Sequence, residues 1–322
     1  MKLRIAGIIL ITILNVLSLG ITEDRPVDEV LKIGDYSYSF KEDGTIRIIE
    51  VFPDESEARI EGYVLDLDEG AMNYIPSSIN GYPVTEIGDN ALESLKILSW
   101  TIPGSIKKIG SYAFANSDVE TIIMEEGVEE LGDCVFANMV FKKIIIPGTV
   151  KKMGENPFCN CLAIDESSGI LISPDNKKFS FIDGVLFDLD ESRLVYYPHE
   201  IREKTYQIPI GTQIIGAYAF SGCSFLEEIV IPNSISTIGE YAFMWCEFQT
   251  INLPKGLSYI QDGTFYRCMH LHMVSIPSSV IKFGEKIFWQ CNLVHLLVEE
   301  GSEAEEYAQV NSINYELVKK SL

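Results

Sequence analysis

Residues 229–246 read IVIPNSISTIGEYAFMWC, and near copies of this stretch recur from about residue 74 to residue 300. Most copies align on a proline and on a phenylalanine eleven residues later, namely Pro103 and Phe114, Pro147 and Phe158, Pro209 and Phe220, Pro232 and Phe243, Pro254 and Phe265, and Pro277 and Phe288. Glu125 and Glu299 take the place of the proline in two further copies. Contiguous copies lie 22 or 23 residues apart, and a fixed period of this size is typical of a solenoid.

Each repeat unit combines a strand signal with turn signals. In the quoted copy, residues 229–231 form a short β-branched run that ends at a proline, so we expect each unit to contribute one strand. Ile238 precedes a glycine, which predicts a buried aliphatic side chain followed by a bend. Ala242 and Phe243 predict a short helical or 3₁₀ turn. A unit this small cannot bury its own apolar face, so the core must come from stacking.

The repeat pattern I-x-I-P-x6-G-x2-A-F-x2-C resembles that of the BspA-like leucine-rich repeat proteins, which are bacterial and protist surface or secreted proteins. The segment from Glu299 to Ala308 is similar to those that close such arrays. The resemblance implies a leucine-rich-repeat solenoid that is mainly β, with short parallel strands in coils of 22 or 23 residues, short helical turns and a right-handed superhelix. It also implies adhesion to, or binding of, host or matrix proteins.

The first 20 residues are predicted to be a secretory signal peptide. Lys2 and Arg4 precede an apolar run over residues 5–19, and small residues precede a cleavage point after Gly20. The run is shorter than the roughly 20 residues that span a bilayer, although an uncleaved signal anchor remains an alternative. We therefore expect a secreted or cell-surface protein that does not insert into the membrane once the signal is cleaved.

The remaining chain divides into five predicted segments. Alternating apolar residues on both sides of the turn at residues 41–44 predict a β-hairpin cap, and the 62 residues between Phe158 and Phe220 exceed one period and hold two apolar runs that predict a second hairpin. The segments are an N-terminal segment and hairpin cap at 21–73, leucine-rich repeats at 74–161, irregular coils with a hairpin insertion at 162–207, leucine-rich repeats at 208–299 and a C-terminal cap at 300–322.

The net charge of −22 bears on which kinds of molecule this protein can bind. Such an acidic protein is repelled by nucleic acid and by anionic lipid headgroups, so neither is an expected partner. The acidity also has a simpler explanation, which is solubility.

Five of the seven cysteines occupy one repeat position, fourteen residues after the anchor; these are Cys161, Cys223, Cys246, Cys268 and Cys291. Ser117 and Met139 occupy the same position in two other coils. Adjacent coils are about 4.8 Å apart, but parallel side chains keep the Cβ atoms farther apart than a disulfide prefers. We therefore predict free, buried thiols. Cys134 lies outside this register, and Cys159 with Cys161 does not form a metal or redox pair of recognised spacing.

The other candidate sites have simpler explanations. Cys268, His270 and His272 are close in sequence but lack a fourth zinc ligand. The acidic stretches at residues 66–70 and 188–191 are incomplete calcium loops, and a solvated turn is the favoured interpretation of both. The chain contains no recognised nucleophile, zinc-protease or phosphate-loop motif. We therefore predict no enzyme activity and no cofactor.

The strands of such a stack line one extended face, and solenoids commonly bind partners there. We take the residue two places before each anchor as the centre of a candidate protein-binding face. This column is Thr101, Ile123, Ile145, Gln207, Val230, Asn252, Ser275 and Leu297. Strand propensity alone explains such residues equally well, so two hypotheses stay open. The leading one is a protein-binding or adhesive function through this face, and the alternative is an envelope spacer without a specific ligand.

Overall fold

The computed structural model describes residues 30–33, 36–51, 75–163, 169–189 and 192–319. The predicted signal peptide, the acidic stretch at 66–70 and two residues of the stretch at 188–191 lie outside the described residues. The described residues form a β-solenoid with coils about 22 residues apart, as the repeat period predicts, and they include one short helix.

Each coil contributes two short strands, so the expectation of one strand per unit is wrong. One strand precedes the anchor, and a second strand of two residues follows it. In the first part of the array the strands before the anchor are β6 (Lys96–Ile102), β8 (Asp118–Met124), β11 (Lys143–Ile146) and β14 (Ile170–Ile172). The strands after it are β7 (Lys108–Ile109), β9 (Glu130–Leu131) and β12 (Lys152–Met153). All of these pair in parallel within their sheets.

The second strand forms because its residues are in register with the same residues of the next coil. Ile109, Leu131 and Met153 turn into the core, while Lys108, Glu130 and Lys152 alternate in charge on the outside. The Lys152 Nζ to Glu130 Oε1 distance is 2.9 Å. Two residues are too few to show a strand pattern in the sequence, and the pairing depends on the neighbouring coil.

The second part of the array repeats this plan. Its strands before the anchor are β18 (Thr205–Gln207), β20 (Glu228–Val230), β22 (Thr250–Asn252), β24 (Met273–Ser275) and β26 (His295–Glu299). Its strands after the anchor are β19 (Ile214–Ile215), β21 (Thr237–Ile238), β23 (Tyr259–Ile260) and β25 (Lys282–Phe283). We call coils 75–163 the first stack and coils 205–299 the second stack. Two further strands of the first stack, β10 (Val140–Phe141) and β13 (Leu162–Ala163), pair in parallel.

The anchoring phenylalanines stack on one another inside the coils. The ring centroids of Phe136 and Phe158 are 5.5 Å apart, and those of Phe243 and Phe265 are also 5.5 Å apart. Because successive coils place this ring at the same point, a column of stacked rings runs through the core of each stack. This packing explains why phenylalanine recurs at the anchor position.

Three antiparallel strands cover the N-terminal end: β1 (Leu31–Ile33), β2 (Tyr36–Phe40) and β3 (Ile46–Val51). β3 then pairs in parallel with β5 (Tyr82–Ile87), the first strand of the repeat sheet that also contains β7. The short β4 (Ser78–Ile79) pairs antiparallel with β5. Since β3 occupies the open edge of β5, the cap satisfies backbone groups that the first coil would otherwise expose.

A three-stranded antiparallel segment joins the two stacks, and its last strand pairs in parallel with β19 of the second stack. Its strands are β15 (Phe179–Ile182), β16 (Val185–Asp188) and β17 (Arg193–Tyr196), and every residue of β16 and β17 is buried. Leu186 packs in the core of the first stack, whereas Val185 and Phe187 pack in that of the second. Apart from the ion pair of Asp188 and Arg193, side chains of β16 and β17 therefore enter the cores of different stacks.

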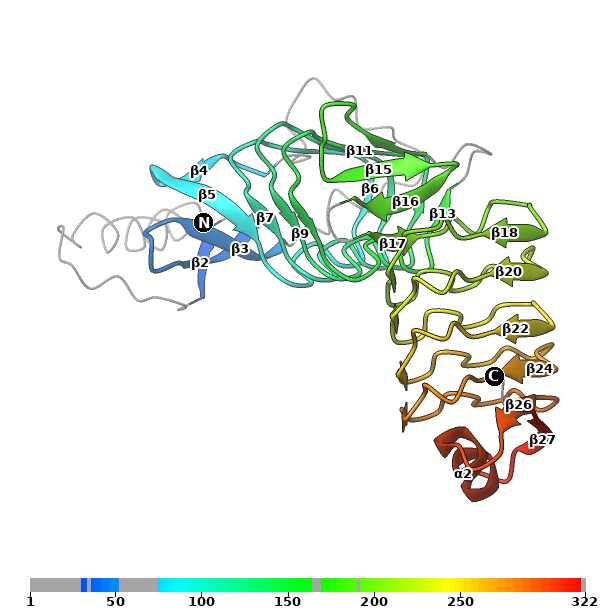
Figure 1. The fold of residues 1–322 in the computed structure, drawn as a ribbon. Helices are drawn as coiled ribbons and strands as arrows, with labels where there is room; N and C mark the ends of the chain where they lie inside the picture. Colours follow the sequence, from blue (N-terminus) through cyan, green and yellow to red (C-terminus); the bar gives the residue numbers. More distant parts are fainter. Residues whose placement is uncertain (1–29, 34–35, 52–74, 164–168, 190–191, 320–322) are drawn as a thin grey trace.

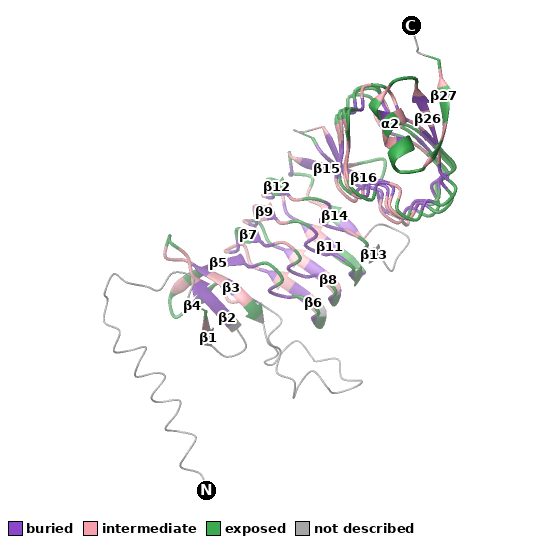
Figure 2. Ribbon diagram, turned by 90° about the horizontal axis from the view of Figure 1, so that it is seen from below, coloured by how far each residue is buried: buried purple, intermediate pink, exposed green. Residues whose placement is uncertain are grey.

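The two stacks run in different directions. In Figure 1 the coils from β5 to β14 succeed one another across the view, whereas those from β18 to β26 succeed one another down it. Figure 2 shows the second stack along its axis and the first from the side. The array is thus a bent solenoid with the sheet β15–β17 at the bend.

A helix and a strand close the C-terminal end. α2 (Glu303–Val310) begins at Ser302, whose Oγ accepts a hydrogen bond from the backbone N–H of Glu305 at 3.2 Å. β27 (Asn314–Val318) pairs in parallel with β26. Among the described residues, no helix has the length and apolar character to cross a membrane.

Candidate binding surfaces

The structure places all eight residues of the predicted strand column on the outside of the coils, half-buried or exposed. They do not form one continuous column. Thr101, Ile123 and Ile145 are partners along β6, β8 and β11. The five others lie on the second stack, where Gln207 pairs with Val230, and Asn252, Ser275 and Leu297 pair in succession. The bend divides the predicted face in two.

The second-stack part of this face carries exposed apolar side chains. Val230 is 46% exposed, and Met273 on the neighbouring column is 40% exposed. Asn252 and Gln207 are exposed polar neighbours. Apolar side chains with polar ones at their rim are typical of interaction surfaces.

A second surface, which the sequence reasoning missed, lies on the turns that follow the short strands of the second stack. We call it the aromatic flank and define it by Tyr218, Tyr241, Trp245, Tyr266, Arg267 and Trp289. Trp245 is 42% exposed and Trp289 is 50% exposed. The rings of Tyr218 and Tyr241 stack with centroids 5.2 Å apart, and the Arg267 guanidinium lies 5.8 Å from the ring centroids of both Trp245 and Tyr266. Trp, Tyr and Arg are the residues most enriched at binding hot spots.

Several of these residues adopt a backbone conformation that favours glycine or asparagine. The φ angle is 56° at Tyr218, 53° at Tyr241, 58° at Trp245 and 60° at Arg267. A bulky residue at positive φ is strained, and such strain commonly accompanies function. Gly263 occupies the position equivalent to Tyr241 one coil later, and the Tyr241 ring fills the space where its side chain would be.

The first stack has another residue type at the repeat position of Trp245, which lies thirteen residues after the anchor. Asn116, Asn138 and Asn160 stand there, also at positive φ. The Asn138 Nδ2 donates to Asn116 Oδ1 at 3.0 Å, and the Asn160 Nδ2 donates to Asn138 Oδ1 at 2.8 Å. Asparagine thus satisfies the same geometry with less strain. At the Tyr218 position, however, the first stack also has an exposed tyrosine, Tyr112, at φ 56°. The sequence signal is the change from Asn to Trp and Arg thirteen residues after the anchor.

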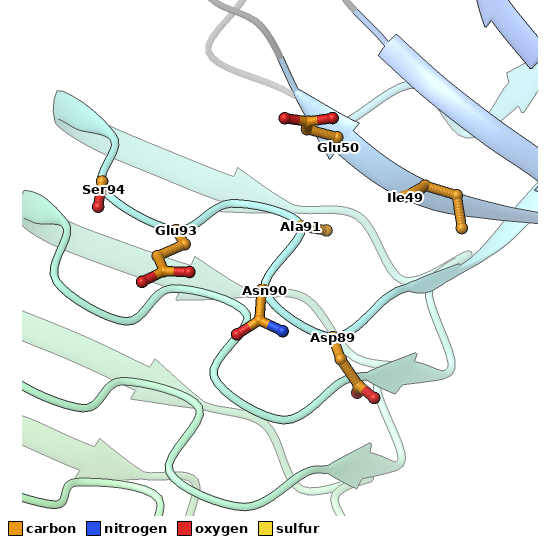
Figure 3. A pocket seen from close by; sticks show the side chains of 7 residues that line it. All are labelled: Ile49, Glu50, Asp89, Asn90, Ala91, Glu93 and Ser94. Atoms are coloured by element: carbon orange, nitrogen blue, oxygen red, sulfur yellow. The ribbon is translucent and has the colours of Figure 1, made fainter. Parts of the chain in front are cut away.

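A shallow recess of about 350 Å³ lies between the N-terminal cap and the first coil. Figure 3 shows its lining, with Glu50 and Ile49 on the cap and Asp89, Asn90 and Glu93 on the coil. The Asp89 Oδ1 accepts from the Ser111 N–H at 2.7 Å, and the Glu93 Oε1 accepts from the Asn116 Nδ2 at 2.9 Å. These carboxylates therefore bind the adjacent coil, and the recess is a structural junction.

The five cysteines that share one repeat position are here called the cysteine ladder, and each is buried where the coils stack on one another. The Cys246 thiol donates to the Phe220 carbonyl at 3.0 Å, and the Cys268 thiol donates to that of Phe243 at 2.9 Å. Cys161, Cys223 and Cys291 donate to the ring residue of an earlier coil in the same way. All seven cysteines are free. Burial raises the pKa of the Cys161, Cys223 and Cys246 thiols.

The structure separates the residues of the considered metal sites. The Cys268 thiol points into the core, whereas His270 is exposed and pairs with Glu247. Asp188 is buried and forms an ion pair with Arg193 at 3.5 Å. Among the described residues, no three His, Cys, Asp or Glu side chains are grouped so that they could hold a metal ion.

The comparisons with known proteins agree with this architecture. The model of the BspA type leucine-rich repeat region matches six copies, over residues 74–166 and 197–315. This chain belongs to the BspA-type leucine-rich repeat family. The resemblance stated from the repeat pattern is thereby confirmed. Proteins of the BspA type are built from the coil described above, and the two matched ranges correspond to the two stacks on either side of the joining sheet.

One solved structure shares the fold of this BspA-type chain, and others are similar to it at lower scores. The pneumococcal vaccine antigen PcpA is 19% identical, with a TM-score of 0.56 over 92% of this chain and 100% of PcpA. A leucine rich cell surface protein from Faecalibacterium prausnitzii A2-165 is 20% identical, with a TM-score of 0.49 over 91% of this chain and 99% of that chain. A leucine-rich repeat protein from Eubacterium ventriosum is 17% identical, with a TM-score of 0.46 over 89% of this chain and 72% of that chain. A comparison with curated protein sequences gave no match.

Proposed function

We propose that this BspA-type protein is displayed on or secreted from the cell, binds another protein and performs no catalysis. The predicted signal peptide at residues 1–20 supports export. The family supports a protein-binding role, since repeat stacks present extended surfaces rather than enclosed pockets. A chain with net charge −22 also favours protein partners over nucleic acid.

The observation that carries this proposal is the left-handed backbone of the exposed aromatic flank. Trp245 and Arg267 stand at φ near 60°, in the position where the first stack has asparagine. An asparagine would reduce the strain by about 1 kcal/mol and leave a more soluble surface. The exposed indole of Trp245 at a strained position is therefore better explained by a partner than by folding. We infer that the aromatic flank is the principal contact surface.

The strand column predicted from the sequence remains a second candidate surface. Its second-stack half presents Val230, Asn252 and Ser275 outward on three successive coils. The spacer hypothesis remains the alternative in which neither surface has a specific ligand.

Three matched variants distinguish these surfaces. The flank variant W245N/R267N/Q290N gives the second stack the asparagines of the first. The strand-column variant V230K/N252K/S275K adds three lysines to the predicted face. The control variant Q213K/S236K/S258K adds the same charge at three exposed positions of a different column.

Each protein is used to capture partners from extracellular-matrix and cell-surface extracts, and any captured protein is purified and titrated. The flank variant should weaken binding at least tenfold, since hot-spot substitutions cost roughly 1–2 kcal/mol or more, while the control binds as the wild type does. Weakened binding only in the strand-column variant would move the site to the strands. Absence of any saturable partner would favour the spacer.

A further inference from the structure

Two cysteines outside the ladder lie on adjacent coils of the first stack. Cys134 follows its anchor, Glu125, by nine residues, and Cys159 follows Pro147 by twelve. The backbone bonds on either side of the pair are those of stacked coils: the Cys134 N–H donates to the Glu155 carbonyl and the Asn138 N–H donates to the Cys159 carbonyl, each at 3.0 Å. The coil spacing therefore places the two residues across one coil boundary.

The two side chains meet in a small cluster of their own. Cys134 is 3% exposed and packs with Ala115 and Ala137, and Cys159 packs against that cluster. Both side chains therefore belong to one small packed cluster beside Ala137. Cys159 is partly exposed, so a small solute can reach the pair from outside.

The ladder cysteines differ in their burial and in the carbonyl acceptors of their thiols. They occupy the same repeat position in successive coils, so their Cα–Cβ bonds are parallel. Each of their thiols is buried and donates to a backbone carbonyl, as Cys268 does to Phe243 at 2.9 Å. Cys134 and Cys159 are offset by three residues along the coil, which is one hydrogen-bonded turn, and both pack in the cluster that contains Ala137.

We propose that Cys134 and Cys159 form a disulfide bond when the protein meets an oxidising environment. The oxidant is a small disulfide such as oxidised glutathione. The Cys134 thiolate attacks one glutathione sulfur, which forms a mixed disulfide and releases the first glutathione thiolate. The Cys159 thiolate then attacks the Cys134 sulfur, the mixed disulfide breaks and the second glutathione thiolate leaves. The two cysteines lose two electrons and two protons, and one oxidised glutathione becomes two reduced ones.

The local chemistry supports the first step. The neighbouring Cys159 thiol lowers the pKa of the Cys134 thiol, while Cys134 raises the pKa of the Cys159 thiol. Since the thiolate is the nucleophile, Cys134 is the thiol expected to react first. Among the seven cysteines of the chain, the pair therefore combines contact, access and a reactive partner.

The bond would fasten the last coil of the first stack to the coil before it. That last coil carries Glu155 and Asn156, which hold the second stack: the Glu155 Oε2 accepts from the Ala217 N–H at 2.9 Å, and the Asn156 Nδ2 donates to the Tyr218 carbonyl at 2.7 Å. Oxidation would thus stabilise the coil on which the bend depends. This inference requires an oxidising environment and is independent of the partner-binding surfaces.

The test uses the whole chain, purified with a reductant and then equilibrated with oxidised and reduced glutathione. Alkylation under denaturing conditions followed by mass spectrometry counts the free thiols, and digestion identifies the linked peptides. We expect five free thiols, a peptide pair that joins Cys134 to Cys159, and a thermal unfolding midpoint several degrees higher than that of the reduced protein.

Three variants separate this outcome from others. C134S and C159S should each abolish the rise in midpoint, while C268S, in the ladder, should keep it. Seven free thiols at every glutathione ratio would overturn the proposal. A linkage between Cys268 and Cys291, or between two molecules, would overturn it as well.

Discussion

Tyr196 and Tyr197 are consecutive residues whose rings belong to different cores. The Tyr196 ring lies 5.5 Å from that of Phe158 at the end of the first stack, and the Tyr197 ring lies 5.1 Å from that of Phe220 at the start of the second. The two consecutive rings therefore connect the column of stacked rings in the first stack with that in the second. This dipeptide lies at the bend of the solenoid.

Replacing Tyr197 tests the packing at the bend. Tyr197→Ala removes a buried ring, and we expect a loss of about 3–5 kcal/mol in the free energy of unfolding. The Tyr197 hydroxyl is buried without a hydrogen-bond partner, so Tyr197→Phe should leave stability unchanged or raise it by about 1 kcal/mol. Urea unfolding of both variants measures this difference. A large loss in Tyr197→Phe would show that the hydroxyl has a partner in solution.

The ion pairs beside the bend differ in burial, which predicts unequal effects. The Arg193 side chain is 9% exposed, and it contacts Asp188 at 3.5 Å, Glu155 at 3.2 Å and the Met153 carbonyl at 2.9 Å. Arg193→Ala leaves the buried Asp188 carboxylate without the guanidinium and should cost about 3–5 kcal/mol. Glu155→Ala removes a half-exposed carboxylate and should cost about 1 kcal/mol. Equal losses in chemical denaturation would contradict this assignment.

The cysteine ladder predicts that stability falls at alkaline pH. Burial raises the pKa of Cys161, Cys223 and Cys246, whereas thiols of the unfolded chain titrate near pH 8.5. The ladder's contribution is therefore complete below about pH 8.5 and is lost as pH rises above that value, by up to about 1.4 kcal/mol per thiol per pH unit. Urea unfolding with a reductant at pH 7.5, 8.5 and 9.5 measures the slope.

A serine variant provides the control for this pH dependence. Cys246→Ser keeps a donor toward the Phe220 carbonyl but does not titrate in this range. The free energy of unfolding of this variant should fall less steeply with pH than that of the wild type, by the contribution of one thiol. A slope equal to that of the wild type would assign the pH dependence to other groups.

Ser117 occupies the ladder position of one coil, so its replacement measures what hydrogen bonds at that position contribute to stability. Its Oγ donates to the Leu92 carbonyl at 2.9 Å and accepts from the Leu95 N–H at 3.0 Å. Ser117→Ala leaves both backbone groups unpaired in the core, so we expect a loss of about 1–3 kcal/mol. The exposed Ser236→Ala should change stability by less than about 0.5 kcal/mol in the same unfolding measurement. A loss at Ser117 no larger than that at Ser236 would contradict this role.

Several features could be predicted because they recur. The proline, phenylalanine and cysteine positions repeat every 22 or 23 residues, so each marks one point of the coil. The second strand of each coil was missed because Lys108 and Ile109 show no strand pattern by themselves. Trp245 and Arg267 were missed because they differ from the asparagines at the same position of other repeats. The positive φ of both residues and the exposure of the indole are known only from the folded chain.

Contacts between different repeat positions could not be predicted either. Cys134 and Cys159 are 25 residues apart and stand at different points of their coils, so the register of the sequence does not place them together. The same reasoning explains why the outward column from Thr101 to Leu297 is divided. Its residues share one repeat position, but the coils that carry them belong to two stacks.

The sequence by itself determined the coil and its stacking, because an apolar pattern that recurs at a fixed period can be buried only against its own copies. The direction of the second stack was decided by the tertiary structure alone. The apolar side chains of β16 and β17 are divided between two different cores. An apolar run of this kind shows in the sequence that it is buried, but the neighbour that covers each face is known only once the chain has folded.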